Sequence, residues 1–247
     1  MTSRIQVFSD AEALSLAAAE QVVLSARAAI ARRGEFHLVL SGGSTPKRLY
    51  EQLASPQFRG RVDWSRVHIY FGDERSVPPD HPDSNFRMAN TALMQPLTLD
   101  SSHVHRMQGE QQDLEQAARD YARIIQLRVP QTNALPVFDL VLLGMGDDGH
   151  TASLFPQTTA LKEKDRLVAP VYVEKLHTWR LTLTYPVINN AQQVLFLIAG
   201  SSKAQRLAEV LTGQPVDYPV KAVQPRGELL WYLDESAAAL LPQEIRA

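Results

Sequence analysis

The sequence predicts an α/β fold in which helices cover both faces of a mostly parallel sheet. Short apolar runs, too short for typical helices, alternate with longer stretches of helical periodicity. Several of these runs end in glycine followed by polar residues, as strands do when they deliver loops to one edge of a parallel sheet. With 247 residues the chain is near the upper size for one hydrophobic core. We therefore expect one domain, residues 1–247, with two closely packed lobes as the alternative.

Composition excludes several classes of function. The formal net charge of −2 offers no global attraction for nucleic acid or for an anionic membrane. Cysteine is absent, which excludes disulfides, thiolate metal sites and cysteine nucleophiles. The N-terminal stretch MTSRIQVFSDAEAL lacks the apolar core of a signal peptide, and no apolar run approaches the ~20 residues that span a bilayer. We expect a soluble cytoplasmic protein without a nucleic-acid or membrane partner, present as a monomer or a dimer.

The first part of the chain predicts a strand, a helix and a second strand. The first strand is expected at Ile5 to Phe8. An alanine-rich helix then begins after a cap at residue 9 or 10 and ends near Arg33, where Gly34 stops it. The second strand is Phe36 to Leu40, and a glycine-rich loop follows it directly.

This loop, SGGSTP at residues 41–46, leads into the amphipathic stretch KRLYEQL. Unpaired backbone N–H groups and the helix dipole favour an anion at such a helix N-terminus. The loop has neither the order of a Walker loop nor that of a G-x-G-x-x-G dinucleotide turn. A plain helix cap with a tight turn is the alternative to a site for a small phosphorylated ligand. The candidate phosphate-binding residues are Gly42, Gly43, Ser44 and Thr45.

A third strand, Val67 to Phe71, ends in a glycine and three charged residues, GDER at 72–75. Such a charged run is usually a solvated turn. The repetition of polar groups at successive strand ends, at what should be one sheet edge, makes Asp73 and Arg75 candidate site residues. A helix is expected to begin at residues 84–85.

Two further segments precede the central motif. A helix is expected from Glu110 to Leu127, followed by a loop from Pro130 to Pro136. His103 and His105 come before this helix, and no carboxylate is spaced to complete a metal site with them. We expect a surface loop there.

The stretch Phe138 to Pro156, FDLVLLGMGDDGHTASLFP, changes from an apolar run to a glycine-rich polar turn within a few residues. Its first part has the length and boundaries of a strand buried on both faces. Ligands of open α/β sheets collect at the carboxyl ends of parallel strands, so His150 is a catalytic candidate. Asp148 stands two residues before it. An ordinary glycine turn with a solvated histidine is the alternative.

The last third of the chain contributes two candidate cations. Arg180 opens a stretch, Arg180 to Tyr185, that alternates like a half-exposed strand, and Lys203 follows a buried strand at Val194 to Ala199. Each cation is either solvated or a phosphate ligand. The other expected elements are a surface return at 161–173, a helix through Leu211, an edge strand at 229–233 and a short alanine-rich helix from about Asp234.

Together these motifs resemble the 6-phosphogluconolactonase family, within the wider group that includes glucosamine-6-phosphate deaminases and isomerases. The matching stretches follow the family order through most of the chain. They are LSGGSTP (40–46), GDERSVPPDHPDSN (72–85), GMGDDGHTASLFP (144–156), RLTLT (180–184) and GSSK (200–203). Relatives often carry two prolines before the arginine, where this chain reads EKLHTWR, so the carry-over to Arg180 rests on R-x-T-L-T alone.

The resemblance implies a Rossmann-like fold and hydrolysis of 6-phosphoglucono-δ-lactone to 6-phosphogluconate, the second step of the oxidative pentose phosphate pathway. It also implies that neither a metal nor an organic cofactor takes part. His150 would act first as base and then as acid, because an imidazole titrates near neutral pH. Asp148 and Asp73 would orient His150 or bind sugar hydroxyls. Arg75 would polarise the lactone carbonyl or contact the phosphate.

The phosphate itself would lie among the loop Gly42 to Thr45, Arg180 and Lys203, because charge-assisted hydrogen bonds to phosphate are strong. Two other functions stay open. Aldose–ketose isomerisation with deamination is disfavoured, because related deaminases carry an asparagine–glutamate pair where this chain has Ser153-Leu154-Phe155. A non-catalytic phosphosugar sensor, of the kind that serves as the effector module of a transcription regulator, is disfavoured because neither a helix-turn-helix extension nor a basic patch is evident.

Overall fold

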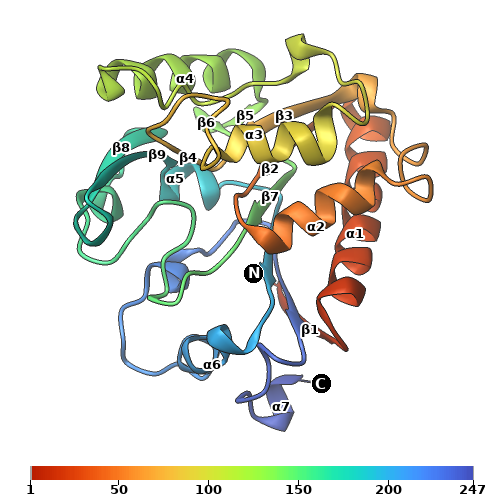
Figure 1. Ribbon diagram of the computed structural model, residues 1–247, viewed down its shortest axis with the longest axis vertical. Helices are drawn as coiled ribbons and strands as arrows, with labels where there is room; N and C mark the ends of the chain where they lie inside the picture. The colour runs from red at the N-terminus through yellow and green to blue at the C-terminus, as the bar shows by residue number, and fades with distance from the viewer. Residues whose placement is uncertain (1, 247) are drawn as a thin grey trace.

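The structure, a computed structural model, describes residues 2–246. Its centre is a six-stranded sheet in which all neighbouring strands are parallel (Figure 1). The strand order is β1-β11-β10-β7-β2-β3. The strands are β1 (Thr2–Phe8), β2 (Phe36–Leu40), β3 (Val67–Phe71), β7 (Leu140–Leu143), β10 (Gln193–Ile198) and β11 (Glu228–Asp234). Helices surround this sheet, and the predicted α/β class is confirmed.

The direction of the strand connections reverses between β2 and β7. From β2 the chain moves outward to β3, whereas from β7 it moves the opposite way, to β10 and then to β11. Open α/β sheets form a ligand crevice at such a reversal, outside the carboxyl ends of the strands. The glycine-rich segments that follow β2 and β7 both begin at this point.

Helices α1 (Ala11–Arg33) and α2 (Ser44–Ala54) pack against each other on one side of the sheet (Figure 1). As predicted, α1 is capped by Asp10, which accepts a hydrogen bond from Ala13 N at 2.8 Å, and it ends at Gly34, whose φ is 86°. Contrary to the expectation that no apolar run approaches the length of a membrane span, α1 is long and apolar enough to cross a membrane by length and composition. It packs on β1, β2 and β11, so its hydropathy reflects core packing.

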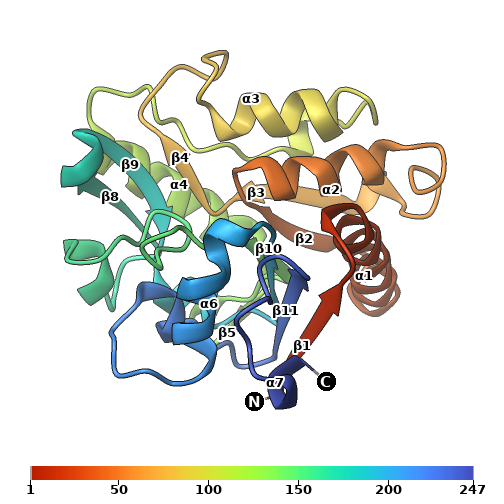
Figure 2. The same cartoon turned by 60° about the horizontal axis from the view of Figure 1, so that its bottom comes forward.

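The opposite side carries α5 (Tyr185–Ile188), α6 (Ala204–Leu211) and a separate antiparallel sheet (Figures 1 and 2). This second sheet has the order β4-β9-β8. Its strands are β4 (Asp73–Arg75), β9 (Thr178–Leu183) and β8 (Val168–Val173). The remaining α-helices and strands are α3 (Asn85–Ala89), which continues into a π-helical turn (Asn90–Met94), α4 (Leu114–Arg128), the hairpin β5 (Gln131–Thr132) and β6 (Leu135–Pro136), and α7 (Gln243–Arg246). Short 3₁₀ turns lie between these elements.

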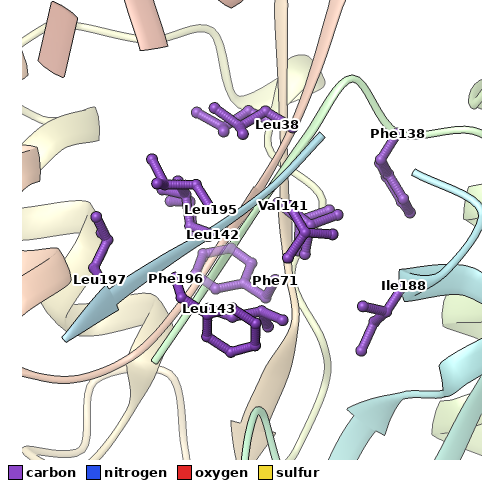
Figure 3. Close-up of a cluster of buried hydrophobic side chains, with 14 of the residues drawn as sticks. Leu38, Phe71, Phe138, Val141, Leu142, Leu143, Ile188, Leu195, Phe196 and Leu197 are labelled. Atoms are coloured by element: carbon purple, nitrogen blue, oxygen red, sulfur yellow. The ribbon is translucent and has the colours of Figure 1, made fainter. Parts of the chain in front are cut away.

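The core lies on both faces of the parallel sheet. Strands β2, β3 and β7 are buried at every position, which explains why their sequences are mostly apolar, with one buried histidine in each of β2 and β3. Figure 3 shows Leu38, Val141 and Leu195, from three neighbouring strands, in one buried cluster. Burial on both faces holds the strand ends at a fixed position for the loops that follow them.

Two buried tyrosines fix the ends of the strands that lead to the crevice. Tyr50 on α2 accepts a hydrogen bond from Ser41 N at 2.9 Å and donates one to Ser41 O at 2.7 Å. Tyr121 on α4 accepts a hydrogen bond from Phe71 N at 2.8 Å. A buried backbone group that leaves a sheet ladder needs another partner. These hydroxyls supply it where the polar loops begin.

The structure corrects several expected elements. The charged run at 73–75 is strand β4 rather than a solvated turn, because it pairs with β9 and buries Asp73 and Glu74. The expected surface return contains β8, which is mostly buried. Strand β11 is not at an edge, since it lies between β1 and β10. In β9, Thr182 is buried rather than half-exposed, because Ser153 N donates to its hydroxyl at 3.2 Å.

Three smaller expectations also differ. The alanine-rich segment after Asp234 forms turns instead of a helix, and the Asp234 carboxylate accepts a hydrogen bond from Ala237 N at 2.7 Å. Helix α4 begins at Leu114 rather than Glu110, because Asp113 caps it. His105 is buried, and with His103 it belongs to a histidine cluster rather than to a solvated loop.

Candidate active site

A cavity of about 370 Å³ opens where the connections reverse, at the carboxyl ends of β2 and β7. Loops after β2, β7 and β10 form its wall together with β4 and β9. The candidate residues on this wall are Gly42, Gly43, Asp73, Arg75, His150, Arg180 and Lys203. Ser44 and Thr45 open helix α2 beside the cavity, and Asp148 lies behind His150, in contact with it.

The turn after β7 presents His150 to the cavity. Gly149 adopts a φ of 77°, and Gly146 N donates a hydrogen bond to His150 O at 2.9 Å, which closes the turn. A Cβ on Gly146 would overlap the His150 ring. Glycine at position 146 therefore lets the imidazole pack directly on the backbone.

Asp148 holds one side of this imidazole. Its Oδ1 lies 2.5 Å from His150 Nδ1 and accepts a further hydrogen bond from His150 N at 3.1 Å. The contact favours the tautomer that carries its proton on Nδ1 and leaves Nε2 free for proton transfer. This is the orientation that a carboxylate gives to a catalytic imidazole.

The second carboxylate oxygen of Asp148 forms an ion pair with Lys175. Burial alone would raise the pKa of Asp148, but hydrogen bonds from His150 and Lys175 outweigh it and hold that pKa well below its ordinary value. Asp148 is therefore ionised at neutral pH. Phe155 supports the other side of the site, with its ring stacked on the His150 ring at a centroid distance of 3.9 Å.

Two arginines form the cationic wall of the cavity. Arg75 and Arg180 are paired directly across β4 and β9, so their like charges repel each other. Burial, followed by the positive charge of Arg75, lowers the pKa of Arg180. An anion bound between these side chains would relieve the repulsion. The arrangement therefore favours a negatively charged ligand.

Asp73 is buried and held by two neighbours. Ser153 Oγ donates to its Oδ2 at 2.7 Å, and the Asn85 side-chain amide donates to its backbone oxygen at 3.0 Å. A Cβ on Gly42 would overlap the Asn85 amide, so the glycine-rich loop approaches this group closely. Of the two aspartates expected to orient His150, Asp148 contacts it, whereas the side-chain hydrogen bonds of Asp73 go to Ser153 and Asn85.

The N-terminus of α2 stands beside the cavity without a side-chain cap. Gly43 occupies the cap position, with a φ of 107° that favours glycine. The backbone N–H groups of the first turn are thus open to an anion. Lys203 lines the same cavity and forms an ion pair with Asp147.

Sequence reasoning missed three residues of this site, Lys175, Phe155 and Asn85. Phe155 and Asn85 stand inside stretches that resemble the family, and at Asn85 the sequence predicts only a helix start. Lys175 lies in the segment EKLHTWR, which carries no motif that predicts a site residue before Arg180. Within residues 2–246, no group of three or more histidine, aspartate and glutamate side chains is arranged to hold a metal ion.

The cavity lies where the direction of the strand connections reverses, and it contains a histidine–aspartate pair and a cationic wall. This combination is typical of an α/β enzyme that acts on a small anionic molecule. A family model described as glucosamine-6-phosphate isomerases/6-phosphogluconolactonase matches residues 9–231. The chain belongs to this family.

Individual relatives agree with the family assignment. A 6-phosphogluconolactonase of Synechocystis sp. is 46% identical over 215 residues, which cover 85% of this chain and 86% of the relative. One from Nostoc sp. is 40% identical and covers 98% of this chain and 99% of the relative. The crystal structure of 6-phosphogluconolactonase from Thermotoga maritima has a TM-score of 0.81 at 32% identity, covering 94% and 100% of the two chains. A solved monomeric glucosamine-6-phosphate deaminase, 22% identical with a TM-score of 0.82 over 96% of this chain and 99% of its own, shares the fold alone.

Proposed function

We propose that this protein is a 6-phosphogluconolactonase that hydrolyses 6-phosphoglucono-δ-lactone to 6-phosphogluconate in the oxidative pentose phosphate pathway. Relatives of that name, which align over 85% and 98% of the chain, support the proposal. The structural observation that carries it is the pairing of His150 with Asp148 at the wall of a cavity that also presents cations. Hydrolysis of a phosphorylated lactone needs both a base for water and a positively charged site for phosphate.

In this mechanism His150 is the general base. Its Nε2 takes a proton from a water molecule while the water oxygen attacks C1 of the lactone, and the carbonyl oxygen becomes an oxyanion. The bond between C1 and the ring oxygen then breaks, and the imidazolium returns the proton to that ring oxygen. Asp148 keeps the ring in position and stabilises the imidazolium.

The other residues bind substrate. The phosphate lies among the α2 N-terminus at Gly42 to Thr45, Arg180 and Lys203. Arg75 faces either the oxyanion or the phosphate. Asp73 binds sugar hydroxyls, because its side-chain partners are Ser153 and Asn85 and not the catalytic imidazole.

A coupled assay on freshly generated lactone tests this function. Spontaneous hydrolysis is subtracted, and wild type is compared with His150→Asn. We expect the wild-type protein to hydrolyse the lactone. The kcat of the variant should be lower by roughly 10²-fold or more. An inactive wild type contradicts the function, and near-wild-type turnover in the variant contradicts the role of His150.

The same preparation distinguishes the alternatives. Ammonia released from glucosamine 6-phosphate would indicate a deaminase, and binding of 6-phosphogluconate without lactonase activity would indicate a sensor. We propose that residues 1–247 act as one cytoplasmic domain, as a monomer or a dimer, without a metal, a cofactor, nucleic acid or a membrane.

A further inference from the structure

Lys175 reaches the active site from a part of the chain remote from the catalytic turn. It lies in a short 3₁₀ turn (Glu174–Leu176) at the tip of the hairpin formed by β8 and β9. His177 closes this turn with a φ of 47°. The turn brings Lys175 and Leu176 to the cavity wall.

At the cavity wall Lys175 touches both groups that hold the catalytic imidazole. Its Nζ pairs with Asp148 Oδ2, while Asp148 Oδ1 contacts His150 Nδ1. The same Nζ lies 4.9 Å from the centroid of the Phe155 ring, which stacks on His150. The chain of contacts from Lys175 to His150 therefore runs through a carboxylate and through an aromatic ring.

The exposure of Lys175 argues against a mainly structural role. Its side chain is 50% exposed, and ion pairs of exposed side chains contribute little to the stability of the fold. Asp148 is less exposed than Lys175. The positive charge of Lys175 should therefore affect the protonation of the Asp148–His150 pair more than the stability of the fold. Any effect of Lys175 should therefore be seen in the chemistry of the Asp148–His150 pair.

The charge of Lys175 opposes that of Asp148. A carboxylate alone favours the imidazolium form of a neighbouring histidine, and a protonated histidine cannot act as a base. An ammonium group on the far oxygen offsets part of this negative charge.

The other charged groups around the cavity have neighbours other than Asp148. Lys203, in the turn after β10, is paired with Asp147 of the catalytic turn, and Asp73 on β4 is held by hydrogen bonds. Arg75 on β4 and Arg180 on β9 face each other. Lys175 is the lysine whose ion pair is with Asp148 itself.

We propose that Lys175 is a positioning residue that fixes the Asp148 carboxylate and keeps His150 in its basic form as the pH falls. This inference rests on the proposed lactonase function and specifies which residue sets its pH range. It assigns no contact between Lys175 and the substrate.

The test compares the pH dependence of kcat in wild type, Lys175→Met, Lys175→Arg and Lys164→Met. Lys164 is an exposed lysine away from the cavity and serves as the matched control. As the pH falls, we expect the kcat of Lys175→Met to decline at a pH about half a unit to one unit higher than the kcat of wild type. Loss of the neighbouring positive charge makes protonation of His150 easier. We expect KM to change less than twofold, Lys175→Arg to restore the wild-type profile, and Lys164→Met to match wild type.

An unchanged kcat profile in Lys175→Met overturns the proposal. So does a change confined to KM, because it would make Lys175 a substrate ligand. Titration of the labelled His150 ring by NMR in the free protein gives a second readout that does not depend on turnover. If wild type has no lactonase activity, the proposed function fails, and the NMR comparison of wild type with Lys175→Met still decides whether Lys175 acts on His150.

Discussion

His37 on β2 and His68 on β3 stack face to face, with ring centroids 5.2 Å apart and an interplanar angle of 12°. His68 also stacks on His105 and lies against His103. This cluster lies near the amino ends of its strands, away from the cavity that contains His150. Burial, followed by the charge of His68, lowers the pKa of both His37 and His105 to about 4. Burial, followed by the charge of His103, lowers the pKa of His68.

The histidine cluster makes folding stability sensitive to acid. In the unfolded chain His37 and His105 take up protons near pH ~6.5, whereas in the folded protein they stay neutral until the pH falls to about 4. The unfolded state therefore holds more protons in that window, so the free energy of unfolding falls as pH falls. Nearby Glu35 opposes this effect, and Arg33 and Arg128 add to it.

Urea unfolding of wild type and His105→Gln between pH 6.5 and 4.5 measures this dependence. In the variant the free energy of unfolding should fall less steeply with falling pH. The slope should be smaller by about 1.4 kcal/mol per pH unit, which corresponds to roughly one proton. His81→Gln, outside the cluster, should keep the wild-type slope. Equal slopes in wild type and His105→Gln would show that the cluster does not resist protonation.

The repulsion between Arg75 and Arg180 predicts stabilisation by an anion. Inorganic phosphate should raise the Tm of wild type by relieving this repulsion, and Arg180→Ala should lose most of that increase. The variant should also raise KM for the lactone about 10-fold or more, with a smaller change in kcat. Arg123→Ala, an exposed arginine on α4, is the control. An equal phosphate-induced rise in Tm in both variants would place the anion elsewhere.

The fold class could be predicted from the sequence because a strand buried on both faces leaves a continuous apolar run. The same rule failed for β4, where Asp73 and Glu74 are buried. Glu74 accepts hydrogen bonds from Asn85 N and Phe86 N at 2.8 Å each, so a buried carboxylate caps the next helix. Its sequence looks like a solvated turn because the groups that compensate its charge come from a distant segment.

In the candidate site, too, local sequence patterns predict some residues, whereas contacts between segments far apart in the chain cannot be predicted from them. Glycine turns at the ends of β2 and β7 indicate where loops approach a ligand, and the structure places His150, which belongs to the second of these turns, on the cavity wall. The contact of Lys175 with Asp148 depends on how a hairpin folds over a loop 27 residues away in the sequence. No periodic pattern in the sequence around Lys175 predicts its contact with Asp148.

The ion pair between Lys203 and Asp147 predicts opposite effects for its two partners. Lys203→Ala should raise KM about 10-fold or more, because a charge-assisted contact to phosphate is worth roughly 1.5–3 kcal/mol. Asp147→Asn should leave KM unchanged or lower it, because it frees the ammonium for the substrate. Steady-state kinetics on both variants, with Lys164→Ala as control, measure this difference. A rise in KM for Asp147→Asn would indicate that the pair positions Lys203 instead of competing with the substrate.

Gly146 and Gly144 offer a matched pair within the segment that leads from β7 to His150. A Cβ at Gly146 would overlap the His150 ring, whereas a Cβ at Gly144 would meet no atom within 4 Å. Gly146→Ala should push the imidazole away from its position against the backbone and lower kcat on the order of 10²-fold, since a displacement near 1 Å is enough for such a loss. Gly144→Ala should keep kcat near the wild-type value. Thermal unfolding of both variants checks that the turn remains folded, and equal kcat values in the two variants would mean that the ring position does not limit turnover.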